Sequence, residues 1–381
     1  MTSFSFSTVP HVRVGAGLAR TLGDECLKLG VSRPLLVTDN GLVSLGLIAP
    51  VAQAIAEQCA SLTVFDGVTA DPSESVVEAA YAVARESDVD GVIAVGGGSS
   101  MDVAKVVSIL MKGERLLADM YGVDQVPPGR LPLVLVPTTA GTGSEVTPVA
   151  VITTGATTKA GVSSAVLLPD VAILDAELTL GLPASATAMT GIDAMVHAIE
   201  AYTSKLKKNP ISDMFALRAL RLLSHNINRV LTQPADLAAR EAMLLGSMFA
   251  GQAFANAPVA AVHALAYPLG GHYHIPHGLS NSLMLPSVLA FNAPAVQQEY
   301  GELAAELPGN VAQSAAGLMT WCSALIAASG LPATLEAAGV AANDLPMLAA
   351  DAMLQQRLLV NNPVEVTEAS ALKLYEKAWS G

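Results

Sequence analysis

Apolar runs alternate with amphipathic stretches through the first half of the chain. Four short runs rich in Val, Leu and Ile have the length of buried strands: 34–39, 62–67, 90–98 and 131–139. Three stretches between them carry apolar residues at helical spacing: 52–60, 75–88 and 101–111. Strands that alternate with helices in this way are typical of βαβ units, so the pattern predicts a parallel sheet covered by helices. We expect 11–17 to add an edge strand or a hairpin arm to this sheet.

The pattern changes after VAILDAELTLGLP at 171–183. From Ala184 onward apolar residues recur at helical spacing, and we expect helices joined by short loops rather than strands. Pro183 directly before Ala184 is typical of a helix start. The sequence therefore predicts two domains, an α/β domain at 1–182 and an all-helical domain at 183–381.

Charge and hydropathy narrow the classes of protein that this chain can represent. The chain has 381 residues and a formal net charge of −13, whereas a nucleic-acid surface needs clustered Lys and Arg, so we expect no nucleic-acid partner. The composition is 52% hydrophobic, yet the most apolar window is interrupted by Gln252, Asn256, Pro258 and His263. A spanning helix needs about 20 mostly apolar residues, so we expect no membrane partner either.

The N-terminus and the cysteines indicate where the protein works. MTSFSFSTVPHVRVG lacks the basic start and apolar block of a signal peptide. Cys26, Cys59 and Cys322 are scattered, without a CxxC pair, which fits a reducing compartment and free thiols. We therefore expect a cytoplasmic protein.

Two glycine-containing turns follow predicted strands and indicate a nucleotide site. VIAVGGGSSMDVAK places Gly96–Gly98 between a strand and a helix, where backbone amides attract phosphate, although such glycines are often only a tight turn. VPTTAGTGSEVT, at 136–147, places threonines and glycines directly after another strand. Because open α/β sheets bind ligands at the carboxyl ends of their strands, both turns are expected at one site.

Asp39 ends the first parallel strand and has two interpretations. Its carboxylate can accept hydrogen bonds from both hydroxyls of an adenosine ribose and would repel a 2′-phosphate, which favours NAD over NADP. It can equally be a helix cap or turn residue ahead of Asn40 and Gly41. The residues alone leave the two interpretations open.

A second set of residues has the spacing of metal ligands. TGIDAMVHAIEAY, at 190–202, places Asp193 and His197 one helical turn apart on one face. AVHALAYPLGGHYHIPHGLS, at 261–280, holds four of the seven histidines within a segment, 242–298, that has no charged residue. We expect His263 on a helix that ends at the Pro268–Gly271 turn, so that the chain doubles back and His277 faces the same cavity.

One carboxylate and three imidazoles form a site for a divalent ion such as Fe(II), Zn(II) or Co(II), and the ligand types do not choose among these metals. Any single histidine could instead be a satisfied core or loop residue. The set as a whole, buried among apolar neighbours such as Ile192 and Val196, favours a metal site.

With these motifs in order, the chain resembles the iron-containing (group III) alcohol dehydrogenases over essentially its whole length. The matching stretches are GGGSSMDVAK, PTTAGTGSEVT, GIDAMVHAIEAY and HALAYPLGGHYHIPHGLSNS. The resemblance implies the dehydroquinate synthase-like fold, with an N-terminal Rossmann-like NAD-binding domain and a C-terminal all-helical metal-binding domain. It also implies an iron site, for which zinc is the alternative metal.

Carried over position by position, the resemblance assigns the site residues. Four residues match the iron ligands: Asp193, His197, His263 and His277. Eleven residues match NAD contacts or lie beside them: Asp39, Asp71, Gly97, Gly98, Ser99, Thr138, Thr139, Thr142, Val151, Lys159 and Leu178.

The chain departs from the family pattern at two positions. Tyr267 stands where many members carry a histidine that is thought to relay protons, and a phenol, with an ordinary pKa of ~10, is a poor base at neutral pH. Asp71 stands where many members carry Asn, and its carboxylate also disfavours a cofactor phosphate. Among the remaining histidines, His274 matches a common loop position and is expected to face substrate or cofactor. His272 has no assigned role.

The activity implied is reversible hydride transfer between a small alcohol or aldehyde and NAD, by a homodimer or a higher homo-oligomer. Three alternatives are weighed against it. A hydroxy-acid or maleylacetate-type reductase would need a cationic clamp, which 242–298 does not offer. A dehydroquinate-synthase-like lyase would need several Lys and Arg near the metal. A non-enzymatic NAD-binding module would not need four metal ligands.

Overall fold

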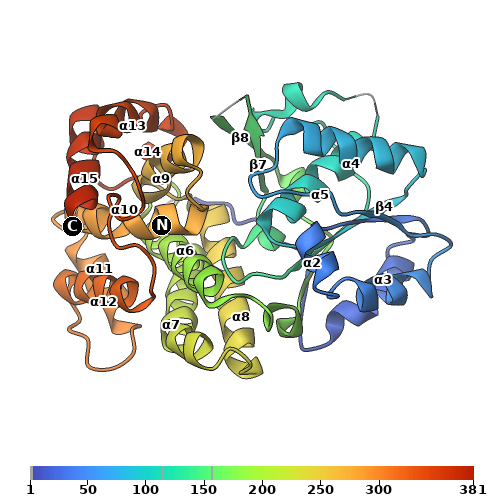
Figure 1. The fold of residues 1–381 in the computed structure, drawn as a ribbon, viewed down its shortest axis with the longest axis horizontal. Coiled ribbons are helices and arrows are strands. Elements are labelled where there is room, and N and C mark those ends of the chain that lie inside the picture. Colours follow the sequence, from blue (N-terminus) through green and yellow to red (C-terminus); the bar gives the residue numbers. More distant parts are fainter. Residues whose placement is uncertain (1–2, 114, 156–157) are drawn as a thin grey trace. The chain divides into compact units, whose positions relative to one another are not determined.

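A computed structural model describes residues 3–113, 115–155 and 158–381 (Figure 1). By its internal contacts the chain divides into two compact units. One unit is Ser7–Gly181, and the other is Leu182–Gly381 together with the N-terminal residues up to Phe6. The apolar pattern places the boundary one residue later, between 182 and 183.

The unit Ser7–Gly181 contains two sheets with helices between their strands. Its strands are β1 (His11–Val14), β2 (Pro34–Val37), β3 (Thr63–Phe65), β4 (Gly91–Gly96), β5 (Gly122–Val123), β6 (Leu133–Pro137), β7 (Val149–Thr154), β8 (Thr158–Ser163) and β9 (Val171–Leu174). Its α-helices are α1 (Leu22–Lys28), α2 (Asn40–Ser44), α3 (Ala49–Ala56), α4 (Glu74–Glu86) and α5 (Gly98–Leu110). Short 3-10 helices are η1 (Leu18–Thr21), η2 (Leu117–Met120), η3 (Ser144–Val146), η4 (Ala165–Leu167) and η5 (Ala176–Thr179).

The larger sheet has six parallel strands in the order β1-β9-β6-β4-β2-β3. Both of its faces are buried, because alternate residues of one strand enter two different clusters. On β4, Val92 and Ala94 pack with α4 and α5, while Ile93 and Val95 pack with α1 and α3. The predicted parallel sheet is confirmed, and 11–17 supplies its edge strand rather than a hairpin arm.

The strand order of the larger sheet indicates where a ligand would bind. The chain runs from β2 outward to β3 and then returns to β4 on the other side of β2. In open parallel sheets, ligands bind outside the carboxyl ends of the strands at such a reversal. Asp39 follows β2 and Gly97 follows β4, so two of the residues expected to contact NAD flank this point.

The smaller sheet, in the order β5-β8-β7, was not predicted from the sequence. β7 and β8 pair antiparallel, with Val151 opposite Gly161 and Thr153 opposite Lys159. Ala150, Ile152 and Val162 of this sheet pack into the same cluster as α5. β5 has two residues and β8 reads TKAGVS, so neither contains the apolar run that identified the other strands, whereas β7 contains such a run, VAVI, that was overlooked.

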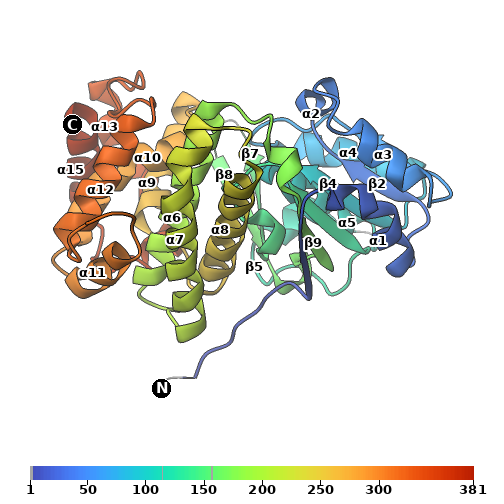
Figure 2. The same cartoon turned by 90° about the horizontal axis from the view of Figure 1, so that it is seen from below.

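The unit that begins at Leu182 is helical throughout its described range, as predicted. Its α-helices are α6 (Ala184–Thr203), α7 (Pro210–Thr232), α8 (Leu237–Asn256), α9 (Ala261–Tyr273), α10 (His277–Asn292), α11 (Gln297–Ala305), α12 (Ala315–Ala328), α13 (Leu345–Ala352), α14 (Gln356–Leu359) and α15 (Glu368–Ser380), with the 3-10 helix η6 (Ala342–Asp344). Helices α6, α7 and α8 lie side by side (Figure 2). None of the helices described in the chain is long and apolar enough to span a bilayer.

One helix boundary differs from the prediction. α9 does not end at the Pro268–Gly271 turn but continues through it to Tyr273, and His274 closes it with a left-handed φ of 54°. A proline inside a helix has no backbone N–H, so the carbonyl group one turn earlier loses its hydrogen-bond partner. A helix that is packed into the protein interior can still continue through such a position. The reversal of the chain therefore takes place at 274–276, before α10 begins at His277.

Candidate active site

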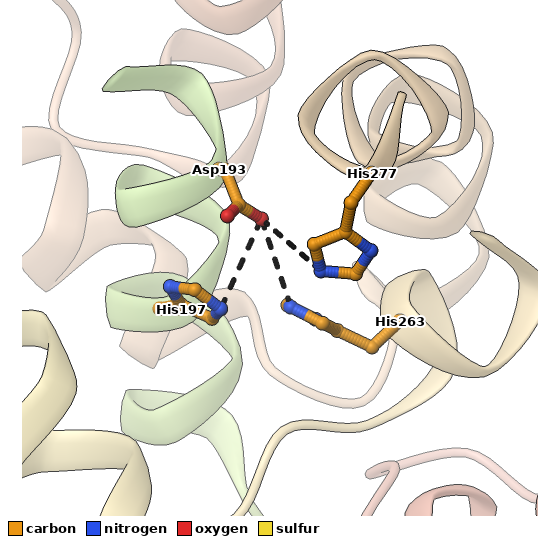
Figure 3. A group of neighbouring side chains, drawn as sticks. All are labelled: Asp193, His197, His263 and His277. Atoms are coloured by element: carbon orange, nitrogen blue, oxygen red, sulfur yellow. Dashed lines mark ion pairs between the residues drawn. The ribbon is translucent and has the colours of Figure 1, made fainter. Parts of the chain in front are cut away.

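Four side chains from three helices of the helical unit point toward one another (Figure 3). Asp193 and His197 lie one turn apart on α6, His263 lies in the first turn of α9, and His277 is the first residue of α10. Each offers one ligand atom, and these atoms all lie within 4.8 Å of one another. The structure thus brings together the four residues that the sequence suggested as metal ligands.

The separations within this group suit coordination of one ion. Asp193 Oδ1 lies 3.8 Å from Nε2 of each of the three histidines, too far for a hydrogen bond. Two ligand atoms each about 2.1 Å from one tetrahedral metal lie roughly 3.4 Å apart. Burial raises the pKa of Asp193, but the nearby His197, His277 and His263 lower it. As a result the pKa of Asp193 lies below its usual range.

The contacts of Asn281 show whether hydrogen bonds alone could satisfy the four candidate ligand atoms. Its amide nitrogen lies 2.6 Å from Asp193 Oδ1, 3.2 Å from His263 Nε2 and 3.3 Å from His277 Nε2. An amide has two N–H groups for these three acceptors, and the buried Asn281 Oδ1 has no hydrogen-bond partner among the residues that the structure describes. A cluster of acceptors around one donor is better satisfied by a divalent cation, so the residues fit a metal ion.

Sequence reasoning missed two residues that contact this group. Asn281 follows His277 by four positions, and Glu200 follows Asp193 by seven, so each shares a helix face with a ligand. Glu200 Oε2 lies 2.7 Å from His263 Nδ1. Helical spacing from a candidate ligand was the available signal for both residues.

The remaining candidates on α9 lie at different distances from the group. The Tyr267 ring is partly buried, with its centroid 6.0 Å from that of His277. His274 is exposed at the end of the helix. His272 pairs with Asp351 of α13 through Nε2 at 2.9 Å, which accounts for a histidine that had no assigned role.

In the other unit, the two glycine-containing turns pack against each other. Thr138 N donates to Gly96 O at 3.0 Å, because β4 and β6 are neighbours in the sheet. A Cβ placed on Gly98 would lie 2.9 Å from Thr142 Cγ2, while one on Gly97 would approach Thr139 no closer than 3.9 Å. Ser99 lies in the first turn of α5, which has no side-chain cap. This helix terminus can therefore accept an anion.

The other residues matched to NAD contacts have structural partners of their own. Asp39 caps α2 by accepting from Leu42 N at 3.0 Å, which realises the second interpretation and leaves the first untested. Asp71, at φ 51°, pairs with Lys159 at 2.6 Å. Val151 N donates to Asp102 Oδ2, and Leu178 packs into the core cluster beside α1 and α3.

A buried charged network lies beneath the 138–149 loop and was also missed. Lys105 Nζ donates to Ser144 Oγ and to Val149 O, each at 2.7 Å, and Ser144 Oγ donates to Asp102. Burial lowers the pKa of Lys105 to about 8 and raises the pKa of Glu145 to about 7. These hydrogen bonds connect α5 to the segment that carries Thr138, Thr139 and Thr142.

A four-residue group that fits a metal ion and a parallel sheet with glycine-containing turns at the carboxyl ends of its strands are features of enzymes that use a metal and a nucleotide. The family model for iron-containing alcohol dehydrogenases matches residues 10–176, and the model for the C-terminal domain of the same family matches residues 187–379. The chain belongs to the iron-containing alcohol dehydrogenase family. It is therefore an oxidoreductase, and the cofactors of its family are NAD and iron.

Individual relatives match over nearly the whole chain. A long-chain-alcohol dehydrogenase of Geobacillus thermodenitrificans is 38% identical over 98% of this chain and 96% of the relative. A 1,3-propanediol oxidoreductase of known structure superposes with a TM-score of 0.95 at 34% identity, covering 99% of this chain and 100% of that one. A sulfoacetaldehyde reductase from Bifidobacterium kashiwanohense, solved with NAD+, gives a TM-score of 0.91 at 30% identity, covering 100% of both chains.

Proposed function

We propose that this protein interconverts a small uncharged alcohol and its aldehyde or ketone, using NAD(H) as the hydride carrier and iron as the resident metal. The observation that carries the proposal is the arrangement of three imidazole nitrogens around Asp193 Oδ1, each at 3.8 Å. Relatives named for long-chain alcohols and for 1,3-propanediol support an alcohol as substrate.

The metal would be held by Asp193, His197, His263 and His277. When bound, divalent iron supplies Lewis acidity toward the substrate oxygen. The protein's part is to keep the four ligand atoms together and dry: Asp193, His197 and His263 are at most 4% exposed. His277 is 31% exposed and marks the side from which a substrate can reach the group.

The nucleotide loops would hold NAD, which supplies the nicotinamide that exchanges hydride with the carbinol carbon. The first-turn amides of α5, with Gly97, Gly98 and Ser99, would hold the pyrophosphate. Asp39 would accept from the ribose hydroxyls through the oxygen that does not cap α2. Thr138, Thr139 and Thr142 lie on the loop packed against those glycines, while Asp71, Lys159, Val151 and Leu178 would complete the binding surface.

The proton of the alcohol hydroxyl has to reach solvent as hydride leaves carbon. We propose that Tyr267 takes part through its hydroxyl, which can orient a water molecule beside His277 but is a poor base. His274, exposed at the end of α9, would exchange the proton with bulk water.

A hydroxy-acid or maleylacetate-type reductase is the main rival activity. A carboxylate substrate requires a cationic group near the metal, whereas the residues described in contact with the ligands include Glu200, Asn281, Phe254 and Tyr267. Arg240, the buried cation of α8, already donates to Thr187 and to Pro234 O. These neighbours favour an uncharged substrate.

The test is NADH oxidation by anaerobically iron-loaded protein over a panel of aldehydes, ketones and keto acids. We expect turnover with uncharged aliphatic aldehydes and little with keto acids. His277→Ala should lower kcat by more than about 100-fold, because losing a ligand should exceed the effect of losing an outer-shell partner. His272→Asn, an exposed change near the end of α9, is the control and should keep full activity. Equal activity of His277→Ala would overturn the proposal.

We further propose that the enzyme works in the cytoplasm as a homodimer or a higher homo-oligomer. The support is the three free cysteines, which are scattered along the sequence, together with the family assignment. Sedimentation of the purified protein gives the oligomeric state directly, and a monomer at micromolar concentration would contradict it.

A further inference from the structure

Glu200 lies on the same face of α6 as the two ligands of that helix. It follows His197 by three positions and Asp193 by seven, so the three side chains are stacked along two helical turns. Glu200 is 4% exposed. A carboxylate this deeply buried requires hydrogen-bond donors to replace its lost hydration.

Three N–H groups at the start of α9 surround this carboxylate. Oε2 accepts from Ala260 N at 3.0 Å and lies 2.7 Å from His263 Nδ1, while Oε1 accepts from Val262 N at 2.6 Å. The sequence of α9 provides no side-chain cap of its own, because its N-cap residue is Ala260. Glu200 therefore caps α9 from the neighbouring helix, where a negative charge also suits the helix dipole.

The same contact determines which nitrogen of His263 carries the proton. A carboxylate can only accept, so Nδ1 bears the hydrogen and Nε2 keeps its lone pair. Nε2 is the atom that lies 3.8 Å from Asp193 Oδ1 and 3.2 Å from the Asn281 amide nitrogen. That nitrogen carries only hydrogens, so its position favours the same tautomer that Glu200 requires.

We propose that Glu200 is a positioning residue of the metal centre. It holds the His263 lone pair toward the other three ligands, and it joins the start of α9 to α6 so that ligands from both helices stay in register. The inference rests on the metal site proposed above. Metal-binding histidines commonly donate their second ring N–H to a carboxylate, and loss of that partner typically weakens metal binding about 10–100-fold.

Charge balance supports the same role. The three imidazoles are neutral when they bind a metal, and Asp193 supplies one negative charge. Glu200, one imidazole away from the ligand atoms, supplies a second. The buried group therefore becomes neutral with a divalent ion, which removes the cost of burying a net charge.

Glutamine at position 200 has the same shape but cannot satisfy the three donors. If its NH2 faced His263, Nδ1 would have to accept and the proton would move to Nε2, where it would block the lone pair. If its NH2 faced Val262, two donors would oppose each other at the 2.6 Å contact. Either arrangement disturbs the first turn of α9 and the position of His263.

The experiment compares wild type, Glu200→Gln and Tyr375→Phe as full-length proteins loaded with zinc or cobalt(II). We expect Glu200→Gln to lose zinc to a chelator about 10–100-fold faster than wild type and to change the visible spectrum of the cobalt form. Tyr375→Phe removes a buried 2.6 Å hydrogen bond to Leu265 O of α9, the helix that carries His263. It should lower the unfolding midpoint but leave metal loss and the cobalt spectrum unchanged.

A measurement on the wild type stands even if Glu200→Gln does not fold. In nitrogen-15 spectra of zinc-loaded protein labelled at histidine, His263 should be protonated at Nδ1 and metal-bound at Nε2. The reverse assignment, or wild-type zinc loss in a folded Glu200→Gln, overturns the role of Glu200 alone. A wild type that takes up no divalent ion overturns the metal site itself, and the inference with it.

Discussion

Tyr267 lies on α9 one turn after His263, with its ring centroid 6.0 Å from that of His277. If its hydroxyl only orients water, its removal should cost little, and we expect Tyr267→Phe to lower kcat less than tenfold. Loss of a true general acid–base typically costs about 100-fold or more. Tyr267→His should shift the pH optimum downward, because imidazole titrates near neutrality.

A pH–rate profile of wild type and both variants checks the role of Tyr267. A thousandfold loss in Tyr267→Phe with intact metal content would mean that the tyrosine itself transfers the proton. If the residue only packs beside α10, the Phe variant should instead lose stability while its kinetics stay unchanged.

Replacing one carboxylate oxygen of Asp39 can separate its role as a helix cap from its proposed contact with the ribose. Asp39 Oδ1 caps α2 through Leu42 N. Asp39→Asn keeps an acceptor for that cap but removes the charge, so we expect unchanged stability and a weaker preference for NADH over NADPH. A 2′-phosphate beside a poorly solvated carboxylate should bind on the order of 100-fold more weakly. A wild type that uses both cofactors equally would show that Asp39 does not face the ribose.

At the scale of elements, the turn between β4 and α5 contains two glycines that are needed for different reasons. Gly98 has no room for a side chain, since its Cβ would lie 2.9 Å from Thr142 Cγ2. Gly97 has an ordinary φ of −73° and no protein atom closer than 3.9 Å to the position of its Cβ. Packing therefore does not require a glycine at this position, and we attribute it to the proposed nucleotide site.

We expect Gly97→Ala to leave the unfolding midpoint unchanged and to weaken NADH binding at least about tenfold, because the new methyl group occupies space needed by the pyrophosphate. Gly98→Ala should instead lose about 1–3 kcal/mol of stability through overpacking. Calorimetric titration with NADH and thermal unfolding of both variants measure the two effects. Unchanged NADH affinity in Gly97→Ala would place the nucleotide elsewhere.

The elements differ in how well the sequence predicts them. The central strands β2, β4 and β6 could be found because each is an apolar run whose residues are all buried. β9, with the sequence VAIL, is buried in the same way but was not predicted as a strand. β8 could not be found, because TKAGVS becomes a strand only through pairing with β7. α9 was predicted too short because tertiary packing carries it through Pro268, which local propensity would treat as a stop.

The site shows the same division between local and long-range information. Asp193 and His197 could be paired from helical spacing, and His263 and His277 from their shared segment. The contact of Glu200 with His263 joins residues 63 positions apart. Helical spacing places Glu200 on the face of α6 that carries the ligands, but it does not identify His263 as its partner. The buried partners of the site, like the Lys105 network, depend on how elements pack.

For the whole molecule, Glu145 links stability to pH. Burial raises the pKa of Glu145 from 4.5 to about 7, so the folded protein binds a proton that the unfolded chain has released in this interval. Stability should therefore fall as pH rises from about 4.5 to 7, by up to ~3 kcal/mol. Glu145→Gln should unfold at a higher temperature than wild type at pH 7.5 and match it near pH 4.5. A difference independent of pH would contradict this.

Metal removal should destabilise the protein through the helical unit alone, because all four candidate ligands lie on α6, α9 and α10. A metal ion present at 100 times its dissociation constant stabilises the folded state by about 2.7 kcal/mol, so a chelator should lower the unfolding midpoint of zinc-loaded wild type by several degrees.

The unfolding midpoint of His263→Ala should be the same with and without chelator. The variant should still be stabilised by NADH, because Gly97, Gly98 and the threonines of the nucleotide loops belong to the other unit. If zinc stabilises His263→Ala as much as wild type, then His263 is not a ligand. If NADH no longer stabilises that variant, the two cofactors do not bind independently.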